Sequence, residues 1–175
     1  MSEKDLAKTY QKKTEKEHIL SNPDTYIGSV ETTDTEVWTY DTDKVTRKTI
    51  AYNPGLYKLF DEFIVNCRDH VVRMIQRKGT PVTYIDVTVD KDSGEITMIN
   101  DGDGIDIEKH PEHDIWIPEL VFANLRTSTN YDKEEKRIGG GRNGIGSKIC
   151  FIWSIYGYVE VVDTTRGLKI GRAHV

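Results

Sequence analysis

The apolar residues between positions 53 and 79 recur at steps of three and four, which predicts an α-helix with one buried face. Asn53 is a favourable N-cap and Pro54 suits the first helical position. Arg77 and Lys78 in the last turn, followed by Gly79, mark the expected end of this helix. The apolar positions are Leu56, Leu59, Phe60, Phe63, Ile64, Cys67, Val71, Met74 and Ile75.

The remaining pattern predicts short strands, one further helix and a polar start. Residues 1–20 are charged and are expected to form a solvated arm, and residues 26–30 a short extended piece. Pro118 opens a predicted helix over residues 119–125. Alternating apolar positions and turn residues predict antiparallel hairpins over residues 31–52, 82–99 and 158–170.

Composition indicates one intracellular domain. The chain has 175 residues and 37% hydrophobic residues, enough for one core. We expect an arm at 1–20 and one domain at 21–175. An apolar run of 18 residues and a signal peptide are absent from the sequence, and the net charge of -5 does not favour a duplex-binding surface. Cys67 and Cys150 lack metal-site spacing and are predicted to be buried free thiols.

A glycine-rich stretch at residues 139–148 carries five glycines in eight positions and leads into an apolar segment. It formally fits a dinucleotide fingerprint, but a charged run at 132–137 stands where that fingerprint needs a strand. The order Ser147–Lys148 reverses that of a P-loop. Exposed backbone N–H groups at a helix N-terminus nevertheless predict polyphosphate binding, in preference to a flexible linker.

Three polar residues share one side of the long predicted helix. Glu62, Asn66 and Asp69 fall within an arc of about 60° at 100° per residue. The alternative interpretation is an ordinary solvated face. Because Glu62 and Asn66 sit between apolar positions, we favour a carboxylate–amide–carboxylate stripe that faces a ligand.

A polar turn and a polar segment follow farther along the chain. Residues 100–104 read Asn-Asp-Gly-Asp-Gly at a strand end, which alone is turn chemistry. Calcium is excluded because Glu112 lies outside EF-hand spacing. Residues 126–145 contain few apolar side chains and are predicted to form a mobile lid.

Together these features resemble the Bergerat (GHKL) nucleotide-binding fold of gyrase-type topoisomerases, heat-shock chaperones, mismatch-repair ATPases and histidine kinases. Within that group the chain is most similar to the ATPase domain of eukaryotic-style type IIA DNA topoisomerases. The resemblance implies an α+β two-layer sandwich, with a mixed, mostly antiparallel sheet, helices on one face and a C-terminally incomplete sheet. The stretches that carry it are residues 10–14, 23–31, 54–62, 127–132 and 140–144.

The resemblance also implies roles for residues, with ATP and Mg²⁺ as the bound species. Glu62 would be the general base and Asn66 the magnesium ligand, while Tyr10 in the arm would reach a partner's nucleotide and join a homodimer. Asn100 and Gly104 would meet the adenine. The full predicted ATP-binding set is Asn66, Asp69, Asn100, Gly104, Ser128, Thr129, Asn130, Gly141, Arg142, Asn143, Gly144, Ile145, Gly146, Ser147, Lys148 and Tyr10.

The chain departs from the family pattern in two residues and in extent. His70 stands where the family usually has asparagine, which is expected to weaken nucleotide affinity, and Asp103 stands where it has a basic residue, which is expected to affect ATP entry. The transducer lysine and the DNA-cleaving tyrosine of complete enzymes are expected to be missing. This chain alone is therefore expected to be at most a weak ATPase that does not cleave DNA, and DNA would be engaged only through the absent parts.

Two other interpretations stay open. One is a nucleotide-binding dimerisation module without turnover, and the other is a chaperone or mismatch-repair GHKL ATPase. The expected localisation is nuclear for a cellular eukaryotic protein and host cytoplasm or nucleus for a viral one.

Overall fold

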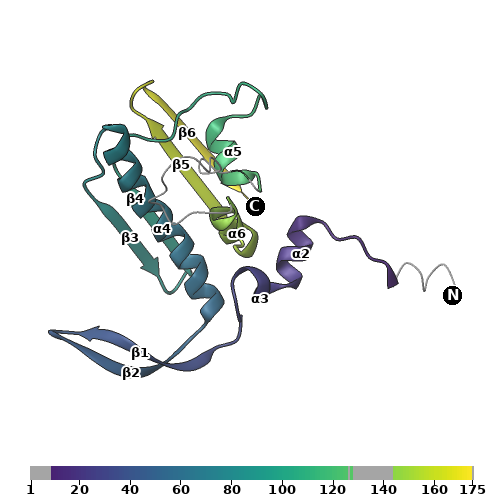
Figure 1. The fold of residues 1–175 in the computed structure, drawn as a ribbon, viewed down its shortest axis with the longest axis vertical. Coiled ribbons are helices and arrows are strands. Elements are labelled where there is room, and N and C mark those ends of the chain that lie inside the picture. The colour runs from purple at the N-terminus through teal and green to yellow at the C-terminus, as the bar shows by residue number, and fades with distance from the viewer. Residues whose placement is uncertain (1–8, 126, 128–143, 175) are drawn as a thin grey trace. The chain divides into compact units, whose positions relative to one another are not determined.

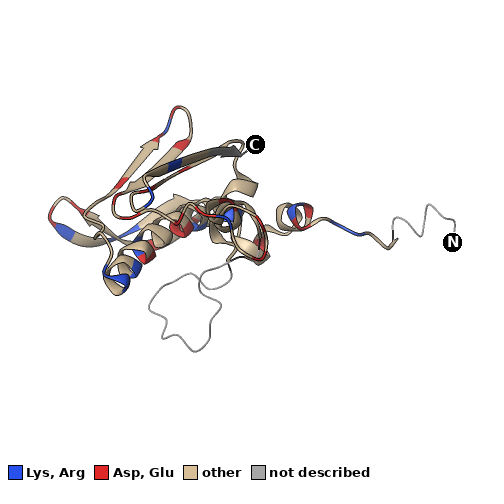
Figure 2. Ribbon diagram, turned by 90° about the horizontal axis from the view of Figure 1, so that it is seen from above, with Lys and Arg blue, Asp and Glu red and all other residues tan. Residues whose placement is uncertain are grey.

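The computed structural model describes residues 9–125, 127 and 144–174 of the chain. The chain divides into two compact units, residues 1–57 and residues 58–175 (Figure 1). The helices of the described part include none that is both long enough and apolar enough to cross a membrane. Lys and Arg are interspersed with Asp and Glu in this part of the chain (Figure 2), in keeping with its net charge of -5.

The first unit begins with two short helices, α2 (Glu15–Ser21) and α3 (Pro23–Tyr26). Thr14 and Glu17 form a reciprocal capping box at the start of α2. The expected solvated arm therefore contains a helix, which the Thr-x-x-Glu spacing could have revealed. The extended piece expected at residues 26–30 is wrong, because Pro23 starts a helical turn that includes Tyr26.

A long antiparallel ribbon completes most of the first unit, as the sequence predicted. Strand β1 (Thr33–Asp41) pairs with β2 (Lys44–Tyr52) in a continuous register that places Trp38 opposite Arg47. Directly opposite residues of antiparallel strands share a face, so Trp38 lies beside the Tyr40–Val45 pair. The side chains of Trp38 and Tyr40 are 71% and 74% exposed.

Helix α4 (Pro54–Arg77) follows the predicted boundaries. The side chain of Asn53 accepts a hydrogen bond from the backbone N–H of Leu56 at 2.9 Å, as expected of an N-cap. At the other end Lys78 takes a positive φ of 53° and Gly79 donates to the carbonyl of Met74. Two expected core positions are wrong, since Leu56 in the first turn and Ile75 in the last turn of α4 are exposed.

The second unit combines two antiparallel hairpins with helices, an α+β arrangement as predicted. Strand β3 (Ile85–Asp90) pairs with β4 (Glu95–Asn100), and β5 (Gly157–Asp163) pairs with β6 (Leu168–His174). Helix α5 (Ile117–Ala123) starts just before the expected Pro118, and α6 (Gly146–Trp153) starts inside the glycine-rich stretch. Among the described residues each strand pairs only with its neighbour in sequence.

Helix α6 packs on α4 through one aromatic and one thiol contact. The rings of Phe63 and Phe151 meet edge to face with centroids 5.6 Å apart. The thiol of Cys150 donates to the backbone carbonyl of Leu59 at 3.2 Å. Cys67 and Cys150 are both free, as predicted, but only Cys150 is buried, and the expected burial of Cys67 is wrong because its side chain is partly exposed. Burial raises the pKa of the Cys150 thiol to about 12.

Candidate functional site

The polar stripe of α4 lies in three different environments. Glu62 is half-buried, Asn66 is exposed, and Asp69 is only 8% exposed. Arg68 reaches the Asp69 carboxylate at 4.0 Å. A fully solvated face would leave all three side chains open, so the burial of Asp69 speaks against that interpretation.

The two carboxylate oxygens of Glu62 have different neighbours. Its Oε1 atom lies 2.6 Å from the ammonium of Lys58, one helical turn earlier. Its Oε2 atom lies against Gly146, where an added Cβ would come within 1.9 Å of that oxygen. Gly146 is the first residue of α6, so the structure brings the predicted base of α4 to the helix start at the end of the glycine-rich stretch.

Lys148 closes a second set of contacts at this helix start. Its ammonium donates to the backbone carbonyls of Thr127, at 2.8 Å, and Gly144, at 2.6 Å. The residue is only 5% exposed, and burial lowers the pKa of its ammonium to about 8. One cation thus joins two backbone positions that are 17 residues apart in the sequence. Ser147 beside it is also buried.

Hydrogen bonds to the carboxylate of Asp101 hold the turn after β4 in place. The carboxylate of Asp101 accepts hydrogen bonds from the backbone N–H groups of Thr83, at 2.7 Å, and Tyr84, at 3.1 Å. Asn100 donates its side-chain amide to the Asp101 carbonyl at 2.9 Å. Gly104 lies so close to β5 that an added Cβ would be 1.9 Å from the carbonyl oxygen of Val162. Close backbone packing therefore demands glycine here in addition to any approach of a base.

His70 and Asp103, the two residues expected to depart from the family pattern, are in contact. The Nε2–H of His70 donates to the backbone carbonyl of Asp103 at 2.7 Å, and Arg73 approaches the other ring nitrogen at 3.5 Å. The Asp103 carboxylate accepts from the backbone N–H of Thr80 and from the Thr164 hydroxyl, each at 2.8 Å. Hydrogen bonds from Thr80 and Thr164 lower the pKa of Asp103, and burial lowers the pKa of His70.

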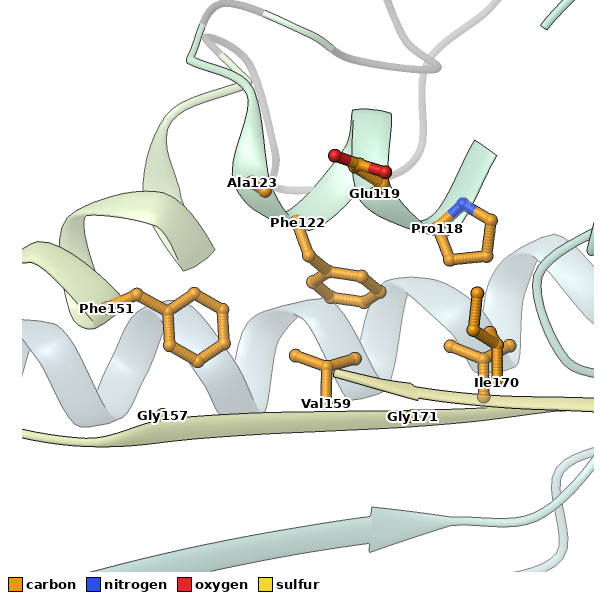
Figure 3. A pocket seen from close by; sticks show the side chains of 10 residues that line it. Pro118, Glu119, Phe122, Ala123, Phe151, Gly157, Val159, Ile170 and Gly171 are labelled. Carbon is orange, nitrogen blue, oxygen red and sulfur yellow. The ribbon is translucent and has the colours of Figure 1, made fainter. Parts of the chain in front are cut away.

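Two cavities lie in the second unit. The smaller, ≈ 70 Å³, lies between α4 and the turn after β4, and among its lining residues are His70, Arg73, Arg77 and Gly104. The larger, ≈ 150 Å³, lies between α5, α6 and the β5–β6 hairpin. In Figure 3 the side chains of Phe122, Val159 and Ile170 line this cavity, while the Glu119 carboxylate points away. This larger cavity is a gap in apolar packing and is lined by none of the described residues predicted to bind ATP.

The donor set fits Mg²⁺ better than a tightly chelated transition metal. Within the described residues no group of three or more His, Cys, Asp or Glu side chains is placed to hold a metal. Mg²⁺ is held in nucleotide sites by one or two protein oxygens together with phosphate oxygens and waters. The exposed amide of Asn66, one turn from Glu62, offers such an oxygen.

The contacts described above do not involve all of the residues predicted to bind ATP. Ser128, Thr129, Asn130, Gly141, Arg142 and Asn143 lie outside the described residues. Tyr10 belongs to the first unit, where its ring is 76% exposed. Ile145 precedes α6 as its N-cap residue.

Sequence reasoning missed two basic residues of α4. Lys58 pairs with Glu62, and the Lys-x-x-x-Glu spacing on a predicted helix was the available signal. Arg73 lines the smaller cavity, and burial lowers the pKa of its guanidinium. Its position one turn after Asp69 continued the polar stripe along α4.

Comparison with known proteins gives the same picture over most of the chain. Residues 51–171 match the family model of histidine kinase-, DNA gyrase B- and HSP90-like ATPases. The chain is 44% identical over 172 residues to DNA topoisomerase 2 of Acanthamoeba polyphaga mimivirus and 47% identical over 163 residues to that of Candida albicans. These two alignments span 95% and 92% of this chain but only 13% and 11% of the respective relatives.

The solved structures agree with the sequence matches. The crystal structure of the ATPase region of Saccharomyces cerevisiae topoisomerase II superposes with a TM-score of 0.87 at 44% identity, covering 95% of this chain and 43% of that one. The ATPase and transducer domains of DNA topoisomerase II from Balamuthia mandrillaris superpose equally well, at 40% identity. Both the predicted fold class and the predicted resemblance are confirmed, and the chain belongs to the histidine kinase-, DNA gyrase B- and HSP90-like ATPase family.

Proposed function

We propose that this chain binds and hydrolyses ATP as the N-gate portion of a type IIA DNA topoisomerase. The family match and the similarity to topoisomerase II ATPase regions support ATP as the ligand. The observation that carries the proposal is the meeting of Glu62 with Gly146 at the start of α6. A carboxylate there lies next to backbone N–H groups that favour a phosphate.

In the proposed reaction Glu62 acts as general base. The oxygen of an attacking water forms a bond to the γ-phosphorus, one proton of that water passes to Oε2 of Glu62, and the bond between the γ-phosphorus and the β–γ bridging oxygen breaks to leave ADP. Asn66 would hold Mg²⁺, which when bound neutralises charge on the phosphate oxygens. Removing the base is expected to slow hydrolysis by about 10²–10⁴-fold.

The other predicted residues would bind the nucleotide. Asn100 and Gly104 lie on the turn after β4, and His70 of α4 holds this turn through Asp103. Lys148 lies at the helix start, where a phosphate would meet its ammonium. Within the described part of the chain, α4 contacts the helix start through Glu62 and the turn after β4 through His70.

The activity of the whole protein is a wider proposal, because the chain spans about an eighth of the curated relatives it matches. ATP binding would join two copies through the arm that carries Tyr10, and DNA strand passage would need the parts found in longer relatives. Localisation would follow the source, nuclear for a cellular protein and host cytoplasm or nucleus for a viral one.

Binding and turnover test this proposal separately. The chain is titrated with a non-hydrolysable ATP analogue and Mg²⁺ by calorimetry, while light scattering follows its mass. ATP turnover is then compared between the wild type and Glu62→Gln. We expect binding in both and turnover only in the wild type. Binding without turnover in both would favour the dimerisation module, and no binding would reject the nucleotide site. Relaxation of supercoiled DNA by this chain alone is expected to be negative.

A further inference from the structure

The ion pair between Lys58 and Glu62 sits at the point where α4 meets α6. The Lys58 ammonium lies 2.6 Å from Oε1 of Glu62 and 3.4 Å from Oδ2 of Asp61. The hydrogen bond to Glu62 raises the pKa of Lys58. The other Glu62 oxygen, Oε2, faces Gly146. Each oxygen of this carboxylate therefore has a different neighbour.

Helix stabilisation alone is a poor explanation for this pair. Along a helix the favourable order places glutamate four residues before lysine, and here Lys58 precedes Glu62. Lysine near the N-terminal end of a helix also opposes the macrodipole. A lysine that precedes a glutamate by four residues stabilises a helix less than the reverse order does. The contact between Lys58 and Glu62 therefore suggests a role other than helix stabilisation.

The contacts between α4 and α6 determine what the Glu62 carboxylate faces. The Phe63–Phe151 ring contact and the hydrogen bond from Cys150 to the Leu59 carbonyl lock α6 against the same turn of α4. Glu62 itself has a flexible side chain with three rotatable bonds. Without a partner on Oε1, that side chain has alternative rotamers in which Oε2 leaves Gly146.

We propose that Lys58 is a positioning residue for the general base: its ammonium holds Oε1 of Glu62 so that Oε2 is presented beside the start of α6. This inference rests on the proposed function, in which Oε2 accepts the proton of the attacking water. Lys58 acts through Glu62, so its loss affects the rate of the chemical step and leaves nucleotide binding intact.

The test compares three variants with the wild type. Lys58→Met keeps the length of the side chain and removes the charge, and Lys58→Arg restores a cation. Lys109→Met is the matched control, because Lys109 also pairs with a carboxylate, Asp114, at 2.8 Å in the same unit but on an exposed loop. Nucleotide affinity is measured with a non-hydrolysable analogue, and hydrolysis under single-turnover conditions with the chain in excess over labelled ATP.

We expect Lys58→Met to lower the single-turnover rate on the order of tenfold. Its dissociation constant for the analogue should stay within about twofold of the wild type, because the removed interaction acts on the chemical step. Lys58→Arg should recover part of the rate, and Lys109→Met should match the wild type. An unchanged rate in Lys58→Met, or a loss of affinity as large as the loss of rate, would overturn the inference, the latter by indicating direct phosphate contact.

A binding-independent measurement checks the pair itself. The ε-methylene signal of Lys58 is followed by NMR during a pH titration of the wild type and of Glu62→Gln. The pKa of Lys58 should fall when Glu62 is replaced, and an unaltered pKa would overturn the inference. A wild type that binds the analogue without hydrolysing ATP would reject the hydrolytic function itself, whereas normal hydrolysis in Lys58→Met would reject only the role of Lys58.

Discussion

The imidazole of His70 donates its Nε2–H to the backbone carbonyl of Asp103 across 2.7 Å, which ties α4 to the turn after β4. These are the two residues that we expect to depart from the family pattern. Asp103 in turn accepts hydrogen bonds from Thr80 and Thr164. Its carboxylate braces the turn between α4 and the β5–β6 hairpin.

This contact predicts a specific pH dependence of stability. Burial, and secondarily the nearby Arg73 and Arg77, lower the pKa of folded His70 below its ordinary 6.5, although the Asp103 carbonyl opposes the shift. The unfolded chain therefore binds more protons, so the contribution of His70 is present above pH 6.5 and is lost as pH falls through the folded pKa.

His70→Asn should remove this loss. The difference in unfolding free energy between wild type and variant, measured by urea denaturation from pH 7.5 to 5, should shift in favour of the variant as pH falls. A difference that is independent of pH would contradict the assignment of a buried neutral imidazole.

Gly104→Ala should destabilise the second unit. The added methyl would meet the Val162 carbonyl, and neither backbone segment can yield without distorting β5. We expect a loss of about 2 kcal/mol or more in urea unfolding. Gly167→Ala is the control, because it adds a methyl in open space at a φ of +64° and should cost only about 1 kcal/mol. Equal losses would argue against the close packing.

Lys148 should make nucleotide affinity sensitive to alkaline pH. Its pKa of about 8 in the free chain means that the ammonium is mostly lost by pH 9. If a phosphate binds only the charged form, the affinity for an ATP analogue falls about tenfold at pH 9. Calorimetry at pH 7, 8 and 9 measures this, and Lys148→Met should give a weaker and flatter profile. The same slope in that variant would assign the dependence to another group.

Asp163→Asn should loosen the β5–β6 hairpin. The buried carboxylate accepts from the backbone N–H of Ile107 at 2.9 Å and pairs with Arg166 at 2.9 Å. These contacts, the Ile107 bond first, lower the pKa of Asp163, so its stabilisation is present above the ordinary 3.8 and is lost at more acid pH. Thermal midpoints should fall for Asp163→Asn and fall less for Glu108→Gln, which removes an exposed partner of Arg166.

Local signals predicted most elements of this fold. The period of three and four, the Asn53 cap and the Pro54 start defined α4, because each acts within one or two turns of the chain. The Leu56 and Ile75 errors arose since periodicity shows which residues are apolar but not how far a neighbouring element covers them. Helix α2 was missed although Thr14 and Glu17 carried a capping signature.

Contacts between distant segments limited the prediction of the site. Asp103 and His70 are 33 residues apart, and their contact depends on how the turn after β4 settles on α4. Gly146 was assigned to phosphate binding, but its closeness to Glu62 follows from the packing of α6 on α4. Residue types at these positions suggested the chemistry, and tertiary packing determined which atoms face one another.

The shielded thiol of Cys150 has a practical consequence for studying this chain. The thiol lies within hydrogen-bonding distance of the Leu59 and Gly146 carbonyls and its pKa is about 12, so it resists alkylation at neutral pH. Burial also raises the pKa of Cys67, but its side chain is partly accessible, so it is the thiol that a maleimide dye reaches first. The native sequence thus provides a nearly unique attachment point for a fluorescent reporter on α4, without any engineered cysteine.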